Sequence, residues 1–279
     1  MTDRLPIGVT LGPIGVDAAW WLDSARRLDD AGYAGIWCWD HFVSRGEKTT
    51  PVLEAWTILT AAAAVTRRAT VGTFVANVMN RHPAVLARMA ATLQQVSGGR
   101  LVVGIGIGGG PAEHAAYGIP FPEASERAAR LEEAVAVLRS LWAGGPAVLE
   151  GRHYPLDGAW AYPRPVPPPP ILIGGRTPAG VRLAARVGDG WAAEADAFET
   201  LEPLYRHALT EAGRDRGSQR VLVGFGSGRA GQDALRASPW IADPRGTLGR
   251  WRALGADEVT VTARTTWDVE ALVEAAQRW

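Results

Sequence analysis

The dipeptide Asp40-His41 carries the residue types best suited to proton chemistry in this sequence. It directly follows an apolar run over residues 35–39 that is typical of a buried strand. Because histidine changes its charge near neutral pH, His41 could act as a general acid, with Asp40 fixing its orientation or touching a bound ligand. A histidine bonded to backbone beneath such a strand is the alternative interpretation, and both stay open at this stage.

Glycine-rich turns after two other apolar runs could hold a phosphate or a planar ring. The candidates are Gly106, Gly108 and Gly109 after residues 101–105, and Gly174, Gly175, Arg176 and Thr177 after residues 171–173. Glycine lets backbone N–H groups approach a ligand closely, and Pro178 predicts a helix start directly after the second turn. Arg176 could add charge for a phosphate. A tight strand-to-helix turn with a surface arginine is the alternative.

Composition and motif spacing argue against several function classes. The 29 basic and 29 acidic residues give a net charge of zero, which argues against nucleic acid as a partner. The single cysteine, Cys38, excludes an internal disulfide, and the N-terminus lacks a signal-peptide pattern, so we expect a cytoplasmic protein. No run approaches the ~20 apolar residues of a membrane span. Metal-ligand spacing and a G-x-S-x-G motif are absent, so we expect neither a metal site nor serine hydrolase chemistry.

The elements that must position these residues alternate between short apolar runs and longer amphipathic runs. The predicted strands are 7–11, 35–39, 70–75, 101–105, 171–173, 190–193, 221–225 and 258–262. Eight β/α units in this length predict an α/β protein with one closed (β/α)8 barrel over residues 1–279, and an open doubly wound sheet is the alternative. Wider spacing between the fourth and fifth strands indicates an insertion over roughly residues 108–170. In a barrel, the residues that follow the strands form the site.

Several short motifs occur in a characteristic order along the chain. They are Trp39-Asp40-His41-Phe42, Arg81-His82-Pro83-Ala84, Ser97-Gly98-Gly99-Arg100-Leu101, Val103-Gly104-Ile105-Gly106, Ile173-Gly174-Gly175 and Gly188-Asp189-Gly190-Trp191. From about residue 7 to residue 191 this order resembles the bacterial luciferase-like family, in particular its branch that uses the deazaflavin coenzyme F420. The resemblance implies a (β/α)8 barrel that carries a deazaflavin or flavin across its strand ends.

The resemblance also implies roles for individual residues. Asp40 and His41 would lie beside the reactive edge of the ring, Thr73, Phe74, Val75 and Ala76 would back it, and Gly106, Gly108 and Gly109 would line it. Gly174, Gly175, Arg176, Thr177 and Trp191 would approach the phosphate tail. A non-proline cis peptide is expected at Thr73-Phe74. The sequence departs from the sugar-phosphate dehydrogenases of the family, because Gly109 and Arg45 stand where these have a glutamate and a tryptophan, which puts sugar-phosphate oxidation in doubt.

These observations predict an F420-dependent oxidoreductase that transfers a hydride between the deazaflavin and a small organic substrate. Two alternatives are a monooxygenase that uses reduced FMN and a barrel that binds a flavin without turnover. The predicted helices over 54–66 and 83–96 are rich in alanine and poor in charge. Exposed apolar surface of that kind usually marks a protein interface, so we expect a homodimer.

Overall fold

The computed structural model describes residues 6–226 and 235–278. Within them, eight parallel strands pair side to side and close into a barrel, because β1 pairs with both β2 and β11 and β3 pairs with β5. The barrel strands are β1 (Ile7–Leu11), β2 (Gly35–Cys38), β3 (Thr70–Thr73), β5 (Leu101–Gly106), β8 (Ile171–Gly174), β9 (Gly190–Glu194), β10 (Arg220–Phe225) and β11 (Glu258–Ala263). This confirms the predicted (β/α)8 barrel and all eight predicted strands.

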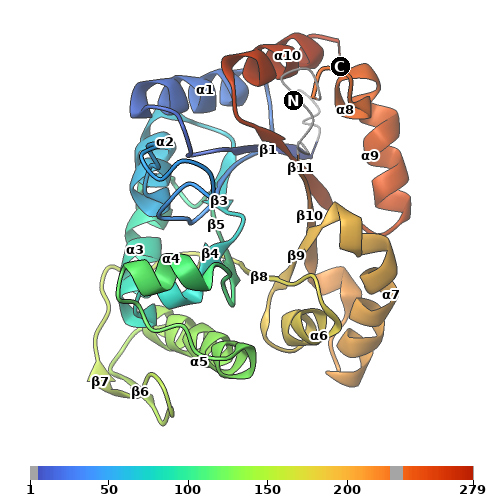
Figure 1. Cartoon of the computed structure of the whole chain (residues 1–279). Coiled ribbons are helices and arrows are strands. Elements are labelled where there is room, and N and C mark those ends of the chain that lie inside the picture. The colour runs from blue at the N-terminus through green and yellow to red at the C-terminus, as the bar shows by residue number, and fades with distance from the viewer. Residues whose placement is uncertain (1–5, 227–234, 279) are drawn as a thin grey trace.

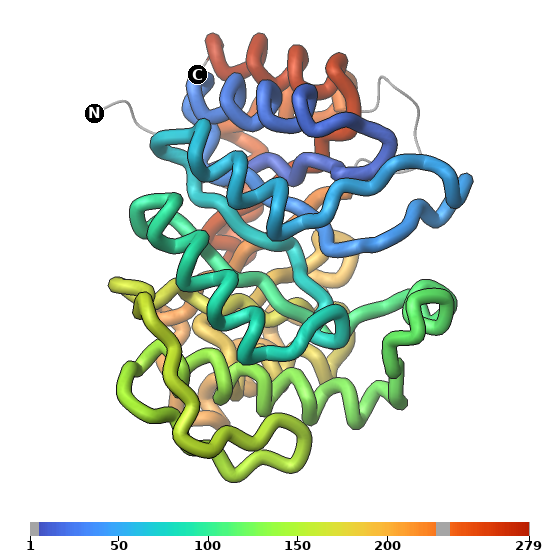
Figure 2. The backbone as a smooth tube through the Cα atoms, turned by 90° about the vertical axis from the view of Figure 1, so that its left-hand side faces the viewer, coloured from blue at the N-terminus to red at the C-terminus, as the bar shows by residue number. Residues whose placement is uncertain are grey.

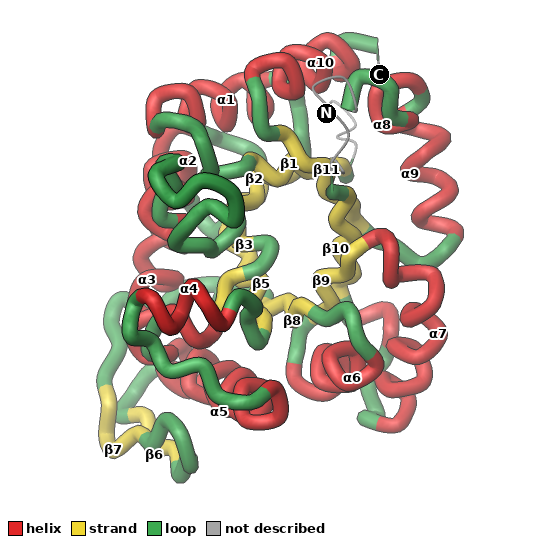
Figure 3. The backbone as a smooth tube through the Cα atoms, in the orientation of Figure 1, coloured by secondary structure: helices red, strands yellow, loops and turns green. Residues whose placement is uncertain are grey.

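Helices surround the barrel, as the view along its axis shows (Figure 1; Figure 3). The long ones are α1 (Ala18–Asp30), α2 (Ala55–Val65), α3 (Pro83–Val96), α5 (Ala124–Ala143), α6 (Pro178–Val187), α7 (Ala195–Glu211), α9 (Pro244–Ala253) and α10 (Thr266–Ala276), and the short ones are α4 (Pro111–Ala116), α8 (Pro239–Ala242), η1 (Val78–Asn80) and η2 (Arg216–Ser218). Prolines begin α3, α6 and α9 directly after side-chain caps from His82, Thr177 and Asp243. None of the helices in the described ranges is long and apolar enough to cross a membrane.

One tryptophan fills much of the barrel interior. Trp37 packs with Val102, Leu172, Ala192 and Leu222 in an inner cluster separate from the larger core between strands and helices. Glycines on neighbouring strands make room for its indole, because a Cβ at Gly8 would lie 2.5 Å from its Nε1. Phe74 and Val75 pack on this inner cluster and are half-buried. The interior is therefore a packed core rather than a channel.

The insertion between β5 and β8 leaves the barrel and returns. After α4 and α5 it forms a small antiparallel hairpin of β6 (Ala147–Leu149) and β7 (Leu156–Ala159), which projects from the barrel beside α3 and α5 (Figure 1). The amide of Gln94 on α3 donates to the Pro167 carbonyl oxygen at 2.8 Å, and the Arg88 guanidinium donates to the Tyr162 carbonyl oxygen. These bonds fix the return segment to the outside of α3.

Candidate active site

The carboxyl ends of the barrel strands form one end of the molecule. The loop after β2, which carries His41, and the segment around α4 project from this same end (Figure 2). Parallel strands in a closed barrel bring the residues that follow them together at that end. We call the residues at and directly after the ends of β2, β3, β5 and β8 the barrel mouth. The predicted site residues lie there, except Trp191, which is described below.

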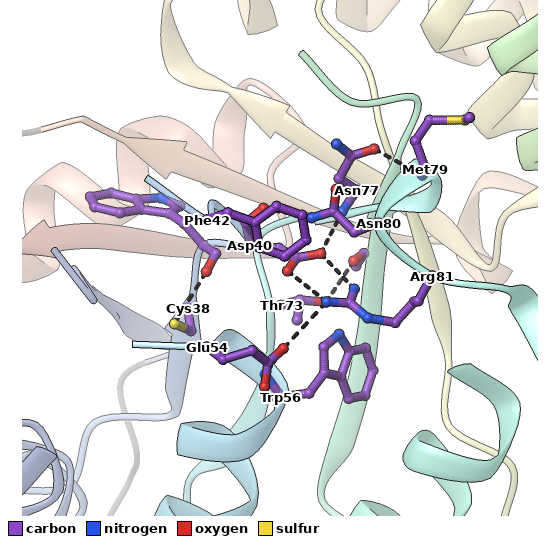
Figure 4. A network of polar contacts seen from close by, with 12 residues as sticks. Cys38, Asp40, Phe42, Glu54, Trp56, Thr73, Asn77, Met79, Asn80 and Arg81 are labelled. Atoms are coloured by element: carbon purple, nitrogen blue, oxygen red, sulfur yellow. Dashed lines mark hydrogen bonds and ion pairs between the residues drawn. The ribbon is translucent and has the colours of Figure 1, made fainter. Parts of the chain in front are cut away.

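Asp40 is held by an arginine from a distant part of the chain (Figure 4). The Arg81 guanidinium donates to both carboxylate oxygens of Asp40, at 2.6 and 2.9 Å, and also lies 3.3 Å from a Glu54 oxygen. The backbone N–H of Asn77 donates to Asp40 at 2.9 Å. Burial lowers the pKa of Arg81, but the hydrogen bonds and charge of Asp40 outweigh it and hold that pKa above its ordinary value. Asp40 is thus engaged with Arg81 and Asn77.

His41 contacts a glutamate that the sequence analysis missed. Its Nδ1 lies 3.3 Å from Oε2 of Glu113 on α4, and the imidazole keeps 31% of its side-chain surface exposed. The other oxygen of Glu113 accepts the backbone N–H groups of Phe42 and Val43. An acidic group therefore reaches the mouth from α4, four residues beyond Gly109. The only sequence signal was an acidic residue in the first turn of a helix that begins at Pro111.

The next residue of α4 is a buried histidine that anchors the helix. His114 has no exposed surface, and its Nε2 lies 2.9 Å from Nδ2 of Asn77 and 3.1 Å from Oδ1 of Asn80. Its Nδ1 lies 3.1 Å from the Gly110 carbonyl oxygen. These contacts attach α4 to β4 (Ala76–Asn77) and η1. Across the described part of the chain, no group of three or more histidine, cysteine, aspartate or glutamate residues could hold a metal ion.

The segment 73–76 lies at the floor of the mouth. The expected cis peptide is one residue later than predicted, at Phe74-Val75 instead of Thr73-Phe74. Thr73 still pairs with Cys38 as the last residue of β3, and its hydroxyl donates to the Gly104 carbonyl oxygen at 2.6 Å, so the chain leaves the strand only after it. Ala76 is buried and resumes pairing with β5. Phe74 and Val75 form the half-buried apolar floor.

The glycines at the ends of β5 and β8 have a steric reason to be glycine. A Cβ at Gly106 or Gly174 would lie 3.0 or 2.8 Å from Cγ2 of Val75. Gly108 has φ +78°, and a Cβ there would lie 2.2 Å from Oδ1 of Asn77. At Gly109, in contrast, a Cβ would meet nothing within 4 Å, and this residue is exposed. Three of these glycines are therefore needed by the packing, and Gly109 borders open space.

The turn after β8 is tight and already hydrogen-bonded. The N–H of Gly175 donates to the Ala192 carbonyl oxygen at 3.3 Å, and the Thr177 hydroxyl caps α6. Arg176 is exposed and forms ion pairs with Glu194 and Asp196, each at 3.2 Å. These observations favour a tight turn with a surface arginine, although Gly174 and the exposed Arg176 stay at the mouth.

Trp191 lies away from the mouth, in the core between the strands and α7. Its ring is fully buried and contacts Phe198 and Tyr205 at centroid distances of 5.4 and 5.3 Å. Its Nε1 donates to the Gly175 carbonyl oxygen at 2.8 Å. The expectation that Trp191 approaches a cofactor tail is corrected accordingly, because its ring supports the Gly175 turn from behind.

Comparisons with known proteins identify a family and relatives for this chain. Residues 7–227 match the family model described as luciferase-like monooxygenase. Among curated relatives, the F420-dependent glucose-6-phosphate dehydrogenases of Kineococcus radiotolerans and Nakamurella multipartita are each 36% identical, over 70% and 69% of this chain. These alignments span 59% and 58% of the relatives, so the chain matches about three fifths of their length.

Solved structures share the fold over nearly the whole chain. An F420-dependent secondary alcohol dehydrogenase in complex with an F420–acetone adduct superposes with a TM-score of 0.82 at 22% identity, over 98% of each chain. The coenzyme F420-dependent tetrahydromethanopterin reductase from Methanopyrus kandleri superposes with a TM-score of 0.76 at 20% identity, over 99% of this chain and 98% of that one. With the family match over most of its length, the chain belongs to the luciferase-like monooxygenase family.

Proposed function

We propose that this protein is an F420-dependent oxidoreductase that transfers a hydride between the deazaflavin and a small organic substrate. The observation that carries the proposal is a partly exposed, carboxylate-paired His41 after β2, whose neighbouring strand β3 leads into the apolar floor of Phe74 and Val75. The names of its relatives and structural neighbours support F420 as the cofactor.

The residues of the mouth fit a planar ring with a phosphorylated tail. Phe74 and Val75 offer a half-buried apolar surface for the ring, and Gly106 borders that surface, because a Cβ there would lie 3.0 Å from Cγ2 of Val75. Gly108 and Gly109 follow Gly106 in the chain and would line the ring beyond it. When bound, F420 would supply the hydride chemistry that no side chain provides. For the tail, Arg176 would exchange Glu194 and Asp196 for a phosphate, which costs little because exposed ion pairs contribute only ~0–1 kcal/mol.

His41 would handle the proton that accompanies the hydride. Reduction of a carbonyl adds a hydride to carbon and requires a proton at oxygen, and oxidation of an alcohol requires removal of that proton. The partly exposed imidazole can exchange protons with both substrate and solvent, whereas the Asp40 carboxylate is buried under Arg81. His41 is therefore the proposed acid–base group. Asp40 would fix the backbone directly before His41.

The substrate is proposed to be a small carbonyl compound or alcohol rather than a sugar phosphate. Gly109 leaves the side of the mouth next to β5 without a side chain, at the position where the family resemblance implies a glutamate in the sugar-phosphate branch. Arg176 at the β8 turn would be engaged by the phosphate of the cofactor tail, so it would not serve a phosphate on the substrate. Both features reduce the polar and cationic groups that a sugar phosphate would need.

A titration with F420 and with FMN, each oxidised and reduced, tests the cofactor. Tight binding of F420 without binding of FMN is the expected result. Preferential binding of reduced FMN would favour the monooxygenase alternative. In that case we expect no turnover of candidate carbonyl compounds with reduced F420. Binding of F420 with no turnover of any carbonyl or alcohol tested would favour a silent barrel.

We also propose that the chain forms a homodimer through the outer face of α2 and the part of α3 that the return segment leaves exposed. Val65, Val85 and Val96 keep 41, 53 and 43% of their surface exposed there, next to alanines on both helices. Light scattering at micromolar concentration is expected to give about twice the chain mass of 29.7 kDa. Val85→Glu should shift this mass towards the monomer, and a monomeric wild-type protein would end the proposal.

A further inference from the structure

Glu113 makes three contacts that all belong to the loop carrying His41. Oε1 accepts the backbone N–H groups of Phe42 and Val43, and Oε2 lies 3.3 Å from Nδ1 of His41. Only 10% of the Glu113 side chain is exposed, against 31% of His41. The carboxylate thus lies beneath the loop, and the imidazole lies between the carboxylate and the solvent.

The position of Glu113 is fixed from its own helix. Gly110 has φ +84° and precedes Pro111, so the chain turns sharply into α4 and brings Glu113 into the first turn. The neighbouring His114 binds Asn77 and Asn80. The backbone of Asn77 in turn binds the Asp40 carboxylate. Contacts therefore run in a closed circuit from His41 through Glu113, His114, Asn77 and Asp40 back to His41.

We propose that Glu113 is a positioning residue that holds the proton of neutral His41 on Nδ1 and thereby leaves Nε2 for proton exchange with the substrate. A carboxylate can only accept a hydrogen bond, so the nitrogen facing it must carry the hydrogen. The other ring nitrogen then has a free lone pair. Asp40 cannot fill this role, because Arg81 and Asn77 occupy its oxygens.

The chemical consequence rests on the proposed function. In alcohol oxidation, Nε2 would accept the hydroxyl proton as the carbon gives its hydride to the oxidised deazaflavin, and the Glu113 carboxylate would stabilise the resulting imidazolium. In carbonyl reduction, the carbonyl carbon would receive the hydride of the reduced deazaflavin, and the imidazolium would donate its Nε2 proton to the oxygen and return to the form protonated on Nδ1. Glu113 itself gains and loses no proton in either direction.

The variant Glu113→Gln separates anchoring from proton placement. Its amide oxygen can still accept the N–H groups of Phe42 and Val43, whereas its NH2 group would face Nδ1 of His41 as a donor. The histidine nitrogen must then accept, so the proton moves to Nε2. Nitrogen-15 NMR of the histidine side chains distinguishes the two tautomers, and the signals of His41 are those that disappear in His41→Ala. The measurement needs neither cofactor nor turnover.

We expect wild-type His41 to be protonated on Nδ1 when neutral and Glu113→Gln to carry the proton on Nε2, with a melting temperature close to wild type. In the active enzyme, kcat should fall about 10²-fold or more, with little change in the KM for F420. Glu113→Ala should in addition have a lower melting temperature, because it leaves the N–H groups of Phe42 and Val43 without their acceptor. The exposed Glu123 on the same insertion provides the control Glu123→Gln, which should resemble wild type.

Two results would overturn the proposal: a wild-type His41 protonated on Nε2, or a Glu113→Gln variant whose tautomer and kcat are unchanged. If the wild-type protein shows no F420-dependent turnover, the proposed function fails, but the tautomer of His41 still decides the role of Glu113. If Glu113→Gln does not fold, the wild-type tautomer alone gives the answer. The two hypotheses therefore fail in distinguishable ways.

Discussion

Arg81 binds both carboxylate oxygens of Asp40 across 41 residues of sequence, with Arg81 11% and Asp40 2% exposed at the side chain. A fork-to-fork pair of this kind is geometrically specific and sparingly solvated. The backbone N–H of Asn77 also binds the Asp40 carboxylate, and the Asn80 amide binds the Asp40 carbonyl oxygen. Asp40 therefore joins the end of β2 to the segment after β3. The neighbour of His41 thus serves the structure of the mouth.

Asp40→Asn is expected to destabilise the protein by about 3 kcal/mol, because removing one partner of a buried pair leaves the other charge poorly compensated. Urea unfolding of the variant measures this loss. Arg176→Ala removes exposed ion pairs and provides the control, with an expected change below about 1 kcal/mol. Equal losses in the two variants would show that the Asp40–Arg81 pair contributes no more than a surface pair.

His41→Ala is expected to lower turnover by about 10²- to 10⁴-fold, the usual range for a lost acid or base, while F420 affinity and melting temperature change little. A partly exposed imidazole contributes little packing, so stability should be kept. His207→Ala on the exposed face of α7 is the matched control. Joint loss of stability and activity would instead favour a structural histidine, and normal turnover would exclude a catalytic one.

Gly174→Ala is expected to destabilise the protein by about 1–3 kcal/mol, because the new Cβ would lie 2.8 Å from Cγ2 of the stiff Val75 side chain. Val75→Ala should remove the clash, so the double variant should be more stable than the sum of the single changes predicts. A double-mutant cycle from denaturant unfolding measures this coupling. Strictly additive losses would mean that Val75 is not what requires glycine at position 174.

Stability at alkaline pH should depend on Tyr205. Burial raises the pKa of Tyr205 to about 12, whereas an unfolded tyrosine ionises near pH 10. Between these values the unfolded state binds fewer protons than the folded state, so stability falls as the pH rises from 10 to 12, by up to about 3 kcal/mol. Tyr205→Phe should remove that part of the loss.

The measurement is the unfolding free energy of wild type and Tyr205→Phe between about pH 9 and pH 12, a range that brackets both ionisations. The exposed Tyr162 provides the control substitution Tyr162→Phe. Parallel alkaline losses in wild type and Tyr205→Phe would show that ionisation of this buried phenol does not limit stability.

The barrel and the positions of its strands could be predicted from local patterns. Apolar runs of strand length, helix starts such as Thr177-Pro178, and glycines at strand ends each depend on neighbouring residues alone. Because every parallel strand of a closed barrel delivers its following residues to one end, the sequence also placed His41 and the glycine turns at the mouth.

Three features were decided only by the tertiary structure. Asp40 meets Arg81, and His41 meets Glu113 across 72 residues, so no local pattern could pair them. A strand that is apolar on both faces does not reveal which of its residues point into the barrel. The sequence therefore could not show that Trp37 fills the inside of the barrel while Trp191 lies in the outer core. The proton chemistry of the mouth thus depends on where an insertion helix docks, and docking is fixed by long-range packing rather than by sequence periodicity.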